Sequence, residues 1–392
     1  VASLIEESTE QEGQLLAPSG VTVASPFFQI RELVVANRGV VLKDTPYADT
    51  LWRTWPDERI RTYAEQLWLL GFNSVQLSEG RGFRITPESE GRALAVAHKL
   101  WVRIDAAHQN GLKVSQLVWG QAPFNRKICW SDPESRAVMK AEFRWMAHTY
   151  AGKVDHVVLH MRDPGGCACG KCDDYRTPQE IAAFVLQEYR KVNPRVTLTL
   201  STWMNPTFWA YAPGVRFLSD TSVQYWTGDP AARFQNMKAV RLLPGAPATK
   251  FLDASFCPRE IGIALHKWYD GRKANLVLRS GRAADIWGWY LSDQETTTDM
   301  SLCMRRLDDY FSSLPRCASE EIRRVSTELC FHGWPQIINA YVSAQKMWAP
   351  YRPLKEIERE FCAGMFGETN AGAMVQLYEA CELVANPKRG DT

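Results

Sequence analysis

The sequence alternates short apolar strands with amphipathic helical segments, and this alternation restricts the fold more than any other feature. Asn73–Glu79 (NSVQLSE) has the pattern of a buried strand, and the helical pattern from Pro87 to Asn110 that follows it ends at Gly111. Leu112–Trp119 (LKVSQLVW) then predicts the next strand. Near-continuous apolar strands separated by amphipathic helices are typical of a parallel sheet covered by helices. The pattern therefore predicts an α/β fold.

Eight such strands are expected along the chain. Helical segments near 231–243, 258–272 and 299–313 separate and follow the last of them. Eight strand–helix units over about 280 residues match the size of a (β/α)₈ (TIM) barrel. An open, doubly wound sheet is the alternative, but no glycine-rich phosphate loop follows any of the strands, so the barrel is favoured. The expected strands span residues 34–42, 73–79, 112–119, 154–162, 195–203, 221–227, 249–255 and 283–290.

The regions on either side of the expected barrel have a different character. Residues 1–30 are polar and weakly patterned, which indicates a linker or extension, and residues 31–315 hold the catalytic barrel. Four successive helical patterns follow from about Ser319 to Asn386, so residues 316–392 are expected to form a C-terminal helical bundle. The chain opens VASLIEESTE without a starting Met, which suggests a processed leader or an upstream domain.

Charge and aromatic content restrict the partners. The 392 residues include 46 Lys+Arg and 44 Asp+Glu, a net charge of +2 without a long run of one sign, which argues against nucleic acid and against a polybasic membrane anchor. No apolar run reaches the roughly 18–20 residues that cross a bilayer. The 15 Trp, 13 Tyr and 16 Phe suit sugar stacking as well as core packing. We expect a carbohydrate substrate, no nucleic acid, no membrane, and an upstream domain or a homo-oligomer; the compartment stays open, with a periplasmic or secreted location slightly favoured over the cytoplasm.

Catalytic groups of a (β/α)₈ barrel lie where its strands end. The expected strand ends carry carboxylates, arginines and aromatic residues, without a serine nucleophile elbow or an HExxH motif. These side chains are typical of glycoside cleavage, which needs an acid, a base or nucleophile, and platforms for sugar rings. Asp163 is the predicted general acid, with Glu295 or Asp253 as its partner. The predicted substrate-binding residues are Arg38, Glu79, His160, Arg162, Trp203, Tyr225, Trp226, Trp287, Trp289 and Asp293.

Each of these assignments has a purely structural alternative. Asp163 could close its loop or form an ion pair with Arg162. Asp293 and Glu295 could cap the helix that follows them, because acidic and threonine side chains are common at helix N-termini. His160 could be a hydrogen-bonded histidine of the barrel, and any of the tryptophans could belong to the core.

A cysteine triplet follows the predicted acid. Cys167-Ala-Cys169-Gly-Lys-Cys172 offers three soft ligands within six residues. Thiolate clusters of this kind bind Zn²⁺, but a tetrahedral site needs a fourth ligand. The chemistry proposed above requires no cofactor, so a metal here would be structural zinc; a local disulfide and reduced thiols are the alternatives. Candidates for the fourth ligand are Asp173, His160 and Cys257.

Two motifs resemble those of carbohydrate-active barrels. Arg38-Gly39, followed by the helical pattern Ile60–Leu70 and Gly71-Phe-Asn73, is similar to the opening of the β-hexosaminidase and α-glucuronidase barrels. The loop DPGGCACGKC, residues 163–172, resembles an acidic-Gly-Gly, Cys-x-Cys-x-x-Cys loop of uncharacterised glycosidase-like proteins. The resemblance implies that Arg38 binds sugar hydroxyls or a carboxylate and that an α/β domain precedes the barrel. β-Hexosaminidases have an Asp-Glu pair after the fourth strand; here Pro164 follows Asp163, which argues against substrate-assisted chemistry.

Together these features predict a glycoside hydrolase acting on a polysaccharide or its oligosaccharides. Arginines at the strand ends, among them Arg38 and Arg162, could clamp a uronate carboxylate in bidentate fashion, which favours acidic sugars. Two other functions stay open from the sequence. One is a carbohydrate-binding barrel without catalysis, and the other is a metal-dependent polysaccharide-active enzyme built on the cysteine triplet.

Overall fold

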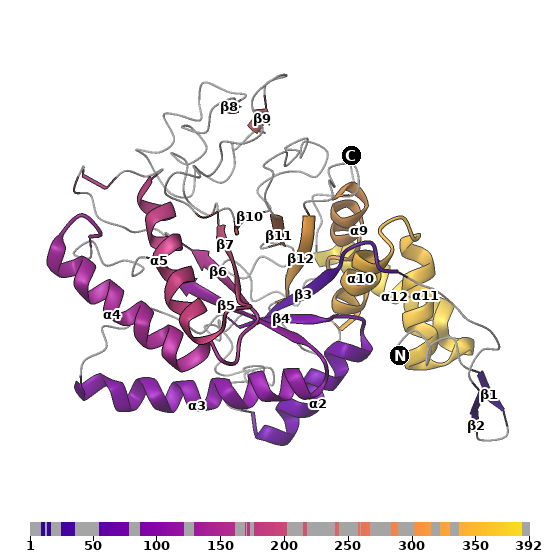
Figure 1. Cartoon of the computed structure of the whole chain (residues 1–392). Helices are drawn as coiled ribbons and strands as arrows, with labels where there is room; N and C mark the ends of the chain where they lie inside the picture. The colour runs from indigo at the N-terminus through magenta and orange to yellow at the C-terminus, as the bar shows by residue number, and fades with distance from the viewer. Residues whose placement is uncertain are drawn as a thin grey trace.

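A computed structural model of the chain shows a closed barrel of parallel strands ringed by helices (Figure 1). Around the barrel the order is β10-β11-β12-β3-β4-β5-β6-β7, and β7 pairs with β10 to close it. The barrel strands are β3 (Ile30–Val35), β4 (Ser74–Leu77), β5 (Lys113–Trp119), β6 (His156–His160), β7 (Thr197–Ser201), β10 (Ile261–His266), β11 (Ala284–Gly288) and β12 (Ile322–Leu329). The structure describes residues 9–11, 14–16, 25–35, 55–77, 87–120, 129–160, 169, 171–172, 176–201, 215–217, 240–242, 258, 260–266, 284–288, 302–314, 322–329 and 337–385.

The predicted (β/α)₈ barrel is confirmed, and its second to fifth strands lie where the sequence predicts them. The first strand is earlier than expected, at Ile30–Val35 and not at 34–42, because the charged residues Arg31 and Glu32 disguise its beginning. Both of these side chains are buried. Arg38 lies three residues after Val35 in sequence and falls outside the described residues.

The last three barrel strands differ from the prediction. Residues 261–266, expected to be helical, form the sixth barrel strand, and the strand expected eighth at 283–290 is the seventh. The strands expected at 221–227 and 249–255 fall outside the described residues. The eighth strand is β12, which lies beyond the expected end of the barrel at residue 315 and replaces the first helix of the expected C-terminal bundle.

Spacing explains why β12 resembles a helix in sequence. Its apolar residues Ile322, Val325 and Leu329 recur at intervals of three and four, which is the helical period. In the barrel, β12 pairs with β11 and β3, and its residues Arg324 and Ser326 are buried among polar partners. Four successive residues of β12, at 324–327, are buried and three of them are polar, so the strand lacks the apolar–polar alternation of a half-buried strand.

The helices on the first half of the barrel follow their strands in order: α2 (Asp57–Leu69), α3 (Pro87–Gln109), α4 (Pro133–Tyr150) and α5 (Arg176–Val192). The Asp132 carboxylate accepts a hydrogen bond of 2.8 Å from the Ser135 backbone N–H and caps α4. Gly71 and Gly111, which follow α2 and α3, have φ of 99° and 74°, a left-handed conformation that a side chain would strain. Local signals thus set where α4 begins and where α2 and α3 end.

Helices form the C-terminal part of the chain as well. α9 (Met304–Ser313) precedes β12, and α10 (Ile337–Trp348), α11 (Leu354–Phe366) and α12 (Glu368–Ala385) follow it. Figure 1 shows α11 and α12 outside the ring, beside α10. The backbone N–H groups of Phe27 and Phe28 donate to carbonyls of α10, so the segment before β3 is held against this helix.

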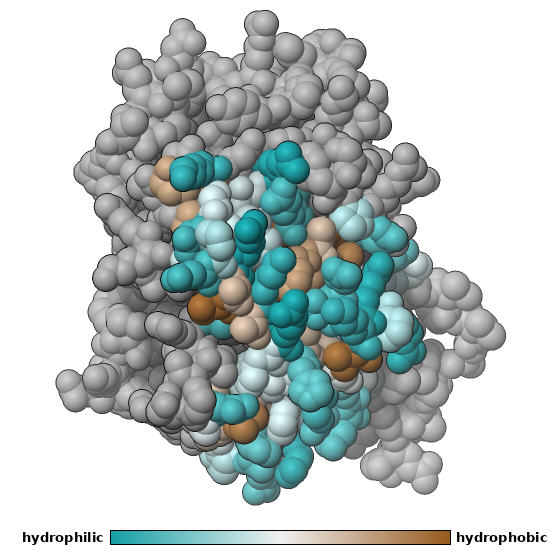
Figure 2. Space-filling view, turned by 60° about the vertical axis from the view of Figure 1, so that its left-hand side comes forward, coloured by the Kyte–Doolittle hydropathy of each residue, from teal (hydrophilic) through white to brown (hydrophobic). Residues whose placement is uncertain are grey.

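Two short antiparallel pairs complete the described structure. β1 (Thr9–Gln11) pairs with β2 (Gln14–Leu16) within the expected N-terminal extension. β8 (Val215–Phe217) pairs with β9 (Val240–Leu242), the latter within a segment expected to be helical. None of the described helices is long and apolar enough to span a membrane. The outer surface over α4 and α5 is mainly hydrophilic, with hydrophobic residues in small separate patches (Figure 2).

Candidate functional site

The carboxyl ends of β5 and β6 lie side by side in the barrel. Trp119 is the last residue of β5 and His160 the last residue of β6, and the two pair in the sheet register. Their ring centroids are 5.1 Å apart, with the ring planes tilted by 56°. Both are buried. Because the active sites of (β/α)₈ enzymes form at the carboxyl ends of the strands, His160 and Trp119 mark this end as the candidate active-site face.

Among the predicted substrate-binding residues, His160 has a side chain that the structure describes. Trp287 is the fourth residue of β11, and only its backbone position is described. The remaining predicted catalytic and substrate-binding residues lie outside the described residues: Asp163, Glu295, Asp253, Arg38, Glu79, Arg162, Trp203, Tyr225, Trp226, Trp289 and Asp293. Most of these follow a barrel strand in sequence, but Asp253, Tyr225 and Trp226 precede β10, because the sixth strand is later than predicted.

Sequence reasoning did not find the ionic network that fills the amino-terminal half of the barrel. Arg324 of β12 forms a buried ion pair with Glu32 of β3. Its Nη1 also donates to the Ser74 and Ser115 hydroxyls, at 3.0 and 2.7 Å. The Ser74 hydroxyl donates to Glu32 Oε2 at 2.8 Å, and the Ser115 hydroxyl also donates to this oxygen. Since β5 is not a neighbour of β3 or β12, these contacts cross the interior of the barrel.

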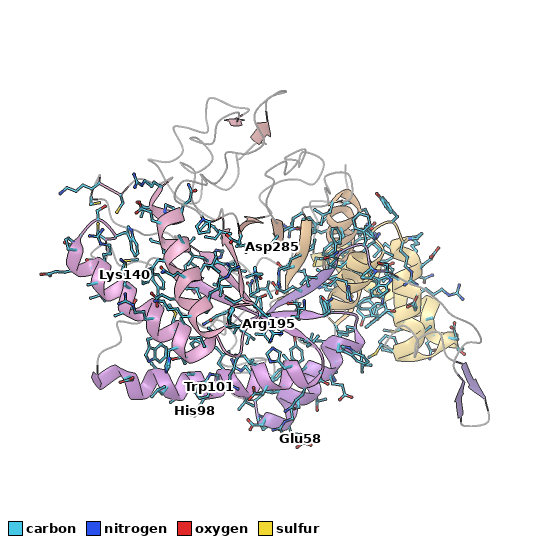
Figure 3. All side chains as sticks on the ribbon, in the orientation of Figure 1. Glu58, His98, Trp101, Lys140, Arg195 and Asp285 are labelled. Atoms are coloured by element: carbon cyan, nitrogen blue, oxygen red, sulfur yellow. The ribbon has the colours of Figure 1, made fainter. Side chains whose placement is uncertain are left out.

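Asp285 and His156 extend this network across the barrel. His156 Nε2 lies 2.9 Å from Asp285 Oδ2, and Arg324 Nε lies 3.7 Å from the same oxygen. The Thr199 hydroxyl donates to Asp285 Oδ2 at 2.9 Å. Figure 3 shows Asp285 in the middle of the barrel, with Arg195 before β7 marking its amino end.

Burial and neighbouring charges shift the pKa values of His156 and Asp285. Burial lowers the pKa of His156, and the neighbouring Arg324 guanidinium lowers it further. Burial by itself raises the pKa of Asp285, but His156 and Arg324 outweigh it, so this pKa lies below its ordinary value. His156 Nε2 thus lies 2.9 Å from an ionised Asp285 carboxylate, while its Nδ1 lies 2.7 Å from Thr197 Oγ1.

This network is a structural element and not the candidate active site. His156 and Ser74 are the first residues of their strands, whereas His160 ends β6. His160 is four residue steps along β6 from His156, which corresponds to about 13 Å along the strand. The network holds seven strands together in the amino-terminal half, namely β3, β4, β5, β6, β7, β11 and β12. Sequence signals for it were present only as isolated charged residues inside strand-like runs.

A cysteine cluster lies between the segments that follow β5 and β6. The sulfurs of Cys129, Cys169 and Cys172 all lie within 4.8 Å of one another. Within the described part of the chain, these three residues are placed so that they could hold a metal ion. Cys129 Sγ is 3.5 Å from Cys169 Sγ and 3.6 Å from Cys172 Sγ. Two members of the predicted triplet are thus together, while Cys167 lies outside the described residues.

Cys129 is the member of this cluster that sequence reasoning missed. It precedes the Asp132 cap of α4 and is 40 residues away from Cys169 in sequence. The loops that follow two adjacent parallel strands lie next to each other. Because the triplet follows β6, a cysteine between the neighbouring β5 and α4 was a candidate partner for it. His160 was considered as fourth ligand and does not belong to the described group, because its ring packs against Trp119. Asp173 and Cys257 lie outside the described residues.

Comparison with known proteins supports the fold. No protein-family model matches the chain, and no curated protein matches it. Among solved structures, a GH138 enzyme targeting pectin rhamnogalacturonan II is similar over 97% of this chain and 46% of its own, with a TM-score of 0.54 and 9% identity. A mutant of the Thermobaculum terrenum O-GlcNAc hydrolase is similar over 90% of this chain and 67% of its own, with a TM-score of 0.54 and 11% identity.

These similarities establish the (β/α)₈ fold found in glycoside hydrolases. The chain spans less than half the length of the GH138 enzyme. At this level of identity, a shared fold does not carry over an activity or a substrate. Function therefore has to be argued from the residues at the carboxyl end of the barrel.

Proposed function

We propose that this chain is a glycoside hydrolase that cleaves a polysaccharide or its oligosaccharides at the carboxyl end of the barrel. The observation that supports this function is the position of the candidate carboxylates relative to the strands. β6 ends at His160, three residues before Asp163, and β11 ends at Gly288, seven residues before Glu295. Segments that directly follow barrel strands form the active sites of enzymes with this fold.

In the proposed mechanism, Asp163 donates a proton to the glycosidic oxygen as the bond to the anomeric carbon breaks. Glu295 either activates a water molecule or attacks the anomeric carbon as a nucleophile. A separation of about 5–5.5 Å between the two carboxyl groups gives retention of configuration, and about 6.5–9.5 Å gives inversion. Asp253 is the weaker partner, since it precedes β10 and does not follow a described barrel strand.

Substrate binding is proposed for residues around the same end of the barrel. Arg38, Glu79, Trp203 and Trp289 follow β3, β4, β7 and β11 within a few residues. Arg38 and Arg162 would bind a sugar carboxylate, since guanidinium groups match carboxylates in bidentate geometry. Trp119 and His160, buried side by side at the ends of β5 and β6, would add aromatic surface at this end of the barrel. We propose that the substrate contains acidic sugars.

The test compares sugar release from an oligosaccharide panel by the parent chain and by Asp163→Asn. We expect the parent to release a product and the variant to lose at least about 10²-fold in kcat, as loss of a general acid does. The loss should be smaller on an aryl glycoside with an acidic leaving group, because such a group departs without protonation. Asp105→Asn is the matched control, since Asp105 pairs with Lys153 on the outside of α3.

Two results would contradict this function. Equal release by the parent and Asp163→Asn would show that another carboxylate is the acid. Oligosaccharide binding without release by either protein would replace the proposal with a carbohydrate-binding barrel that has no catalytic activity.

A further inference from the structure

We propose that Cys129, Cys169 and Cys172 bind a structural zinc ion that ties together the segments following β5 and β6. The three residues come from two parts of the chain, since Cys129 precedes α4 while Cys169 and Cys172 precede α5. Their sulfurs nevertheless meet within 4.8 Å. Zinc is the metal of choice for clustered thiolates, which are soft ligands that it binds in tetrahedral geometry.

The sulfur separations match a zinc site and not a disulfide. In a tetrahedral site with Zn–S bonds of about 2.3 Å, neighbouring sulfurs lie about 3.8 Å apart. The observed separations from Cys129 Sγ are 3.5 and 3.6 Å. A disulfide would require about 2.05 Å. The three sulfurs therefore outline one face of a tetrahedron large enough for the ion.

Backbone and side-chain donors surround the sulfurs as they do around a thiolate ligand. The backbone N–H groups of Lys171 and Cys172 donate to Cys169 Sγ at 3.3 and 3.4 Å. The Ser131 hydroxyl lies 3.1 Å from Cys172 Sγ. Such outer hydrogen bonds orient metal ligands and spread the negative charge of a thiolate. The cluster thus has the ligands and also part of the shell that a metal site needs.

A fourth ligand completes a structural zinc site. Cys167 is the sequence's candidate, because it comes two residues before Cys169, and two residues of extended chain reach about 7 Å at most. A site closed by protein thiolates has no open position for substrate or water. The role we infer is therefore structural, which argues against a metal-dependent polysaccharide-active enzyme built on these cysteines.

The ion would anchor the chain at the edge of the candidate active-site face where β5 and β6 end. Cys169 lies six residues after Asp163, so a metal at this cluster would restrain the segment that leaves β6. Trp130, next to Cys129, donates from Nε1 to Glu180 of α5 at 3.3 Å, and this contact joins the same two segments. The zinc site would add a second and stronger link between the segments before α4 and α5 beside the Trp130–Glu180 hydrogen bond.

The test measures metal in the full chain by mass spectrometry and by cobalt substitution. We expect about one zinc per chain, and a Co²⁺-loaded protein with thiolate charge-transfer bands and tetrahedral visible bands. Cys129→Ser and Cys172→Ser should lose most of the zinc, whereas Cys381→Ser, a change at an exposed cysteine of α12, should retain it. The readout is metal content and not sugar release, so the result is independent of the proposed glycosidase activity.

The parent chain alone keeps the proposal testable if a variant fails to fold. Folded parent protein that contains no zinc, and that shows no thiolate bands when titrated with Co²⁺ under reducing conditions, would overturn it. Full zinc retention by Cys129→Ser would overturn the assignment of Cys129. Cys167→Ser is expected to weaken zinc binding, and unchanged affinity in that variant would remove Cys167 as the fourth ligand.

Discussion

At the scale of single residues, the barrel interior depends on one cation shared by two carboxylates. Arg324 contacts Glu32 directly and lies 3.7 Å from Asp285, and all three side chains are buried. Such a network adds little net stability when complete, because desolvation offsets its attraction. Removing the cation is different, since Glu32 would then keep uncharged partners such as serine hydroxyls. Asp285 would keep His156 and Thr199.

We expect Arg324→Met to lower the free energy of unfolding by about 3–5 kcal/mol, the cost of breaking a buried ion pair. Urea unfolding at neutral pH measures this change. Arg144→Met is the matched control, because Arg144 is largely exposed and lies 3.6 Å from Glu188, an arrangement worth less than about 1 kcal/mol. A loss below 1 kcal/mol for Arg324→Met would contradict the role of Arg324 as the cation that stabilises the two buried carboxylates.

At the scale of elements, α11 and α12 pack with a carboxyl group between them. Glu358 of α11 is buried, and its Oε2 has no hydrogen-bond partner among the described residues. Burial, reinforced by the nearby Glu379 and Glu382 of α12, raises the pKa of Glu358 to about 7. We therefore expect the packing of these two helices to depend on pH.

We expect Glu358→Gln to stabilise the protein at pH 8 and to have little effect at pH 4.5. The unfolded chain releases the Glu358 proton near its ordinary pKa of 4.5, whereas the folded chain keeps it until about pH 7. The free energy of unfolding consequently falls as pH rises from 4.5 to 7 and then levels off. Melting temperatures of parent and variant across this range test the prediction.

Glu368→Gln serves as the control for this experiment, because Glu368 is exposed at the start of α12. That variant should keep the pH dependence of the parent. If Glu358→Gln also keeps it, the Glu358 carboxyl is ionised in the folded protein and the two helices pack around a charge.

At the scale of the whole molecule, closure of the barrel depends on a strand far along the chain. β12 pairs with both β11 and β3, so this eighth strand joins the seventh strand to the first. Without it, β11 and β3 would each present an unpaired edge, and exposed edges promote aggregation. The segment before β3 is held by α10, which adds a second requirement for the C-terminal part.

We expect a chain ending at residue 315 to aggregate and a chain ending at residue 353 to unfold cooperatively. The longer chain keeps β12 and α10 and lacks only α11 and α12, so its melting temperature should fall without loss of the barrel. Circular dichroism melts and gel filtration distinguish the two outcomes. A compact, cooperatively folded chain of 315 residues would show that β12 is not needed for closure.

The sequence by itself determined the fold class and the positions of four consecutive strands. β4, β5, β6 and β7 have apolar runs next to capped helices, and both signals are local. β3, β10 and β12 were placed wrongly because buried polar or glycine-containing strands lack the local pattern of apolar residues. Their identity depends on partners elsewhere in the barrel.

Only the tertiary structure decided which distant residues meet. The sequence indicated thiolate ligands at Cys169 and Cys172, but the barrel brings Cys129 to them across 40 residues. In the same way, Glu32 and Arg324 are 292 residues apart in sequence and form an ion pair inside the closed barrel. Periodicity and capping record the interactions of neighbours along the chain, whereas closure of a barrel pairs residues whose separation in sequence carries no repeating signal.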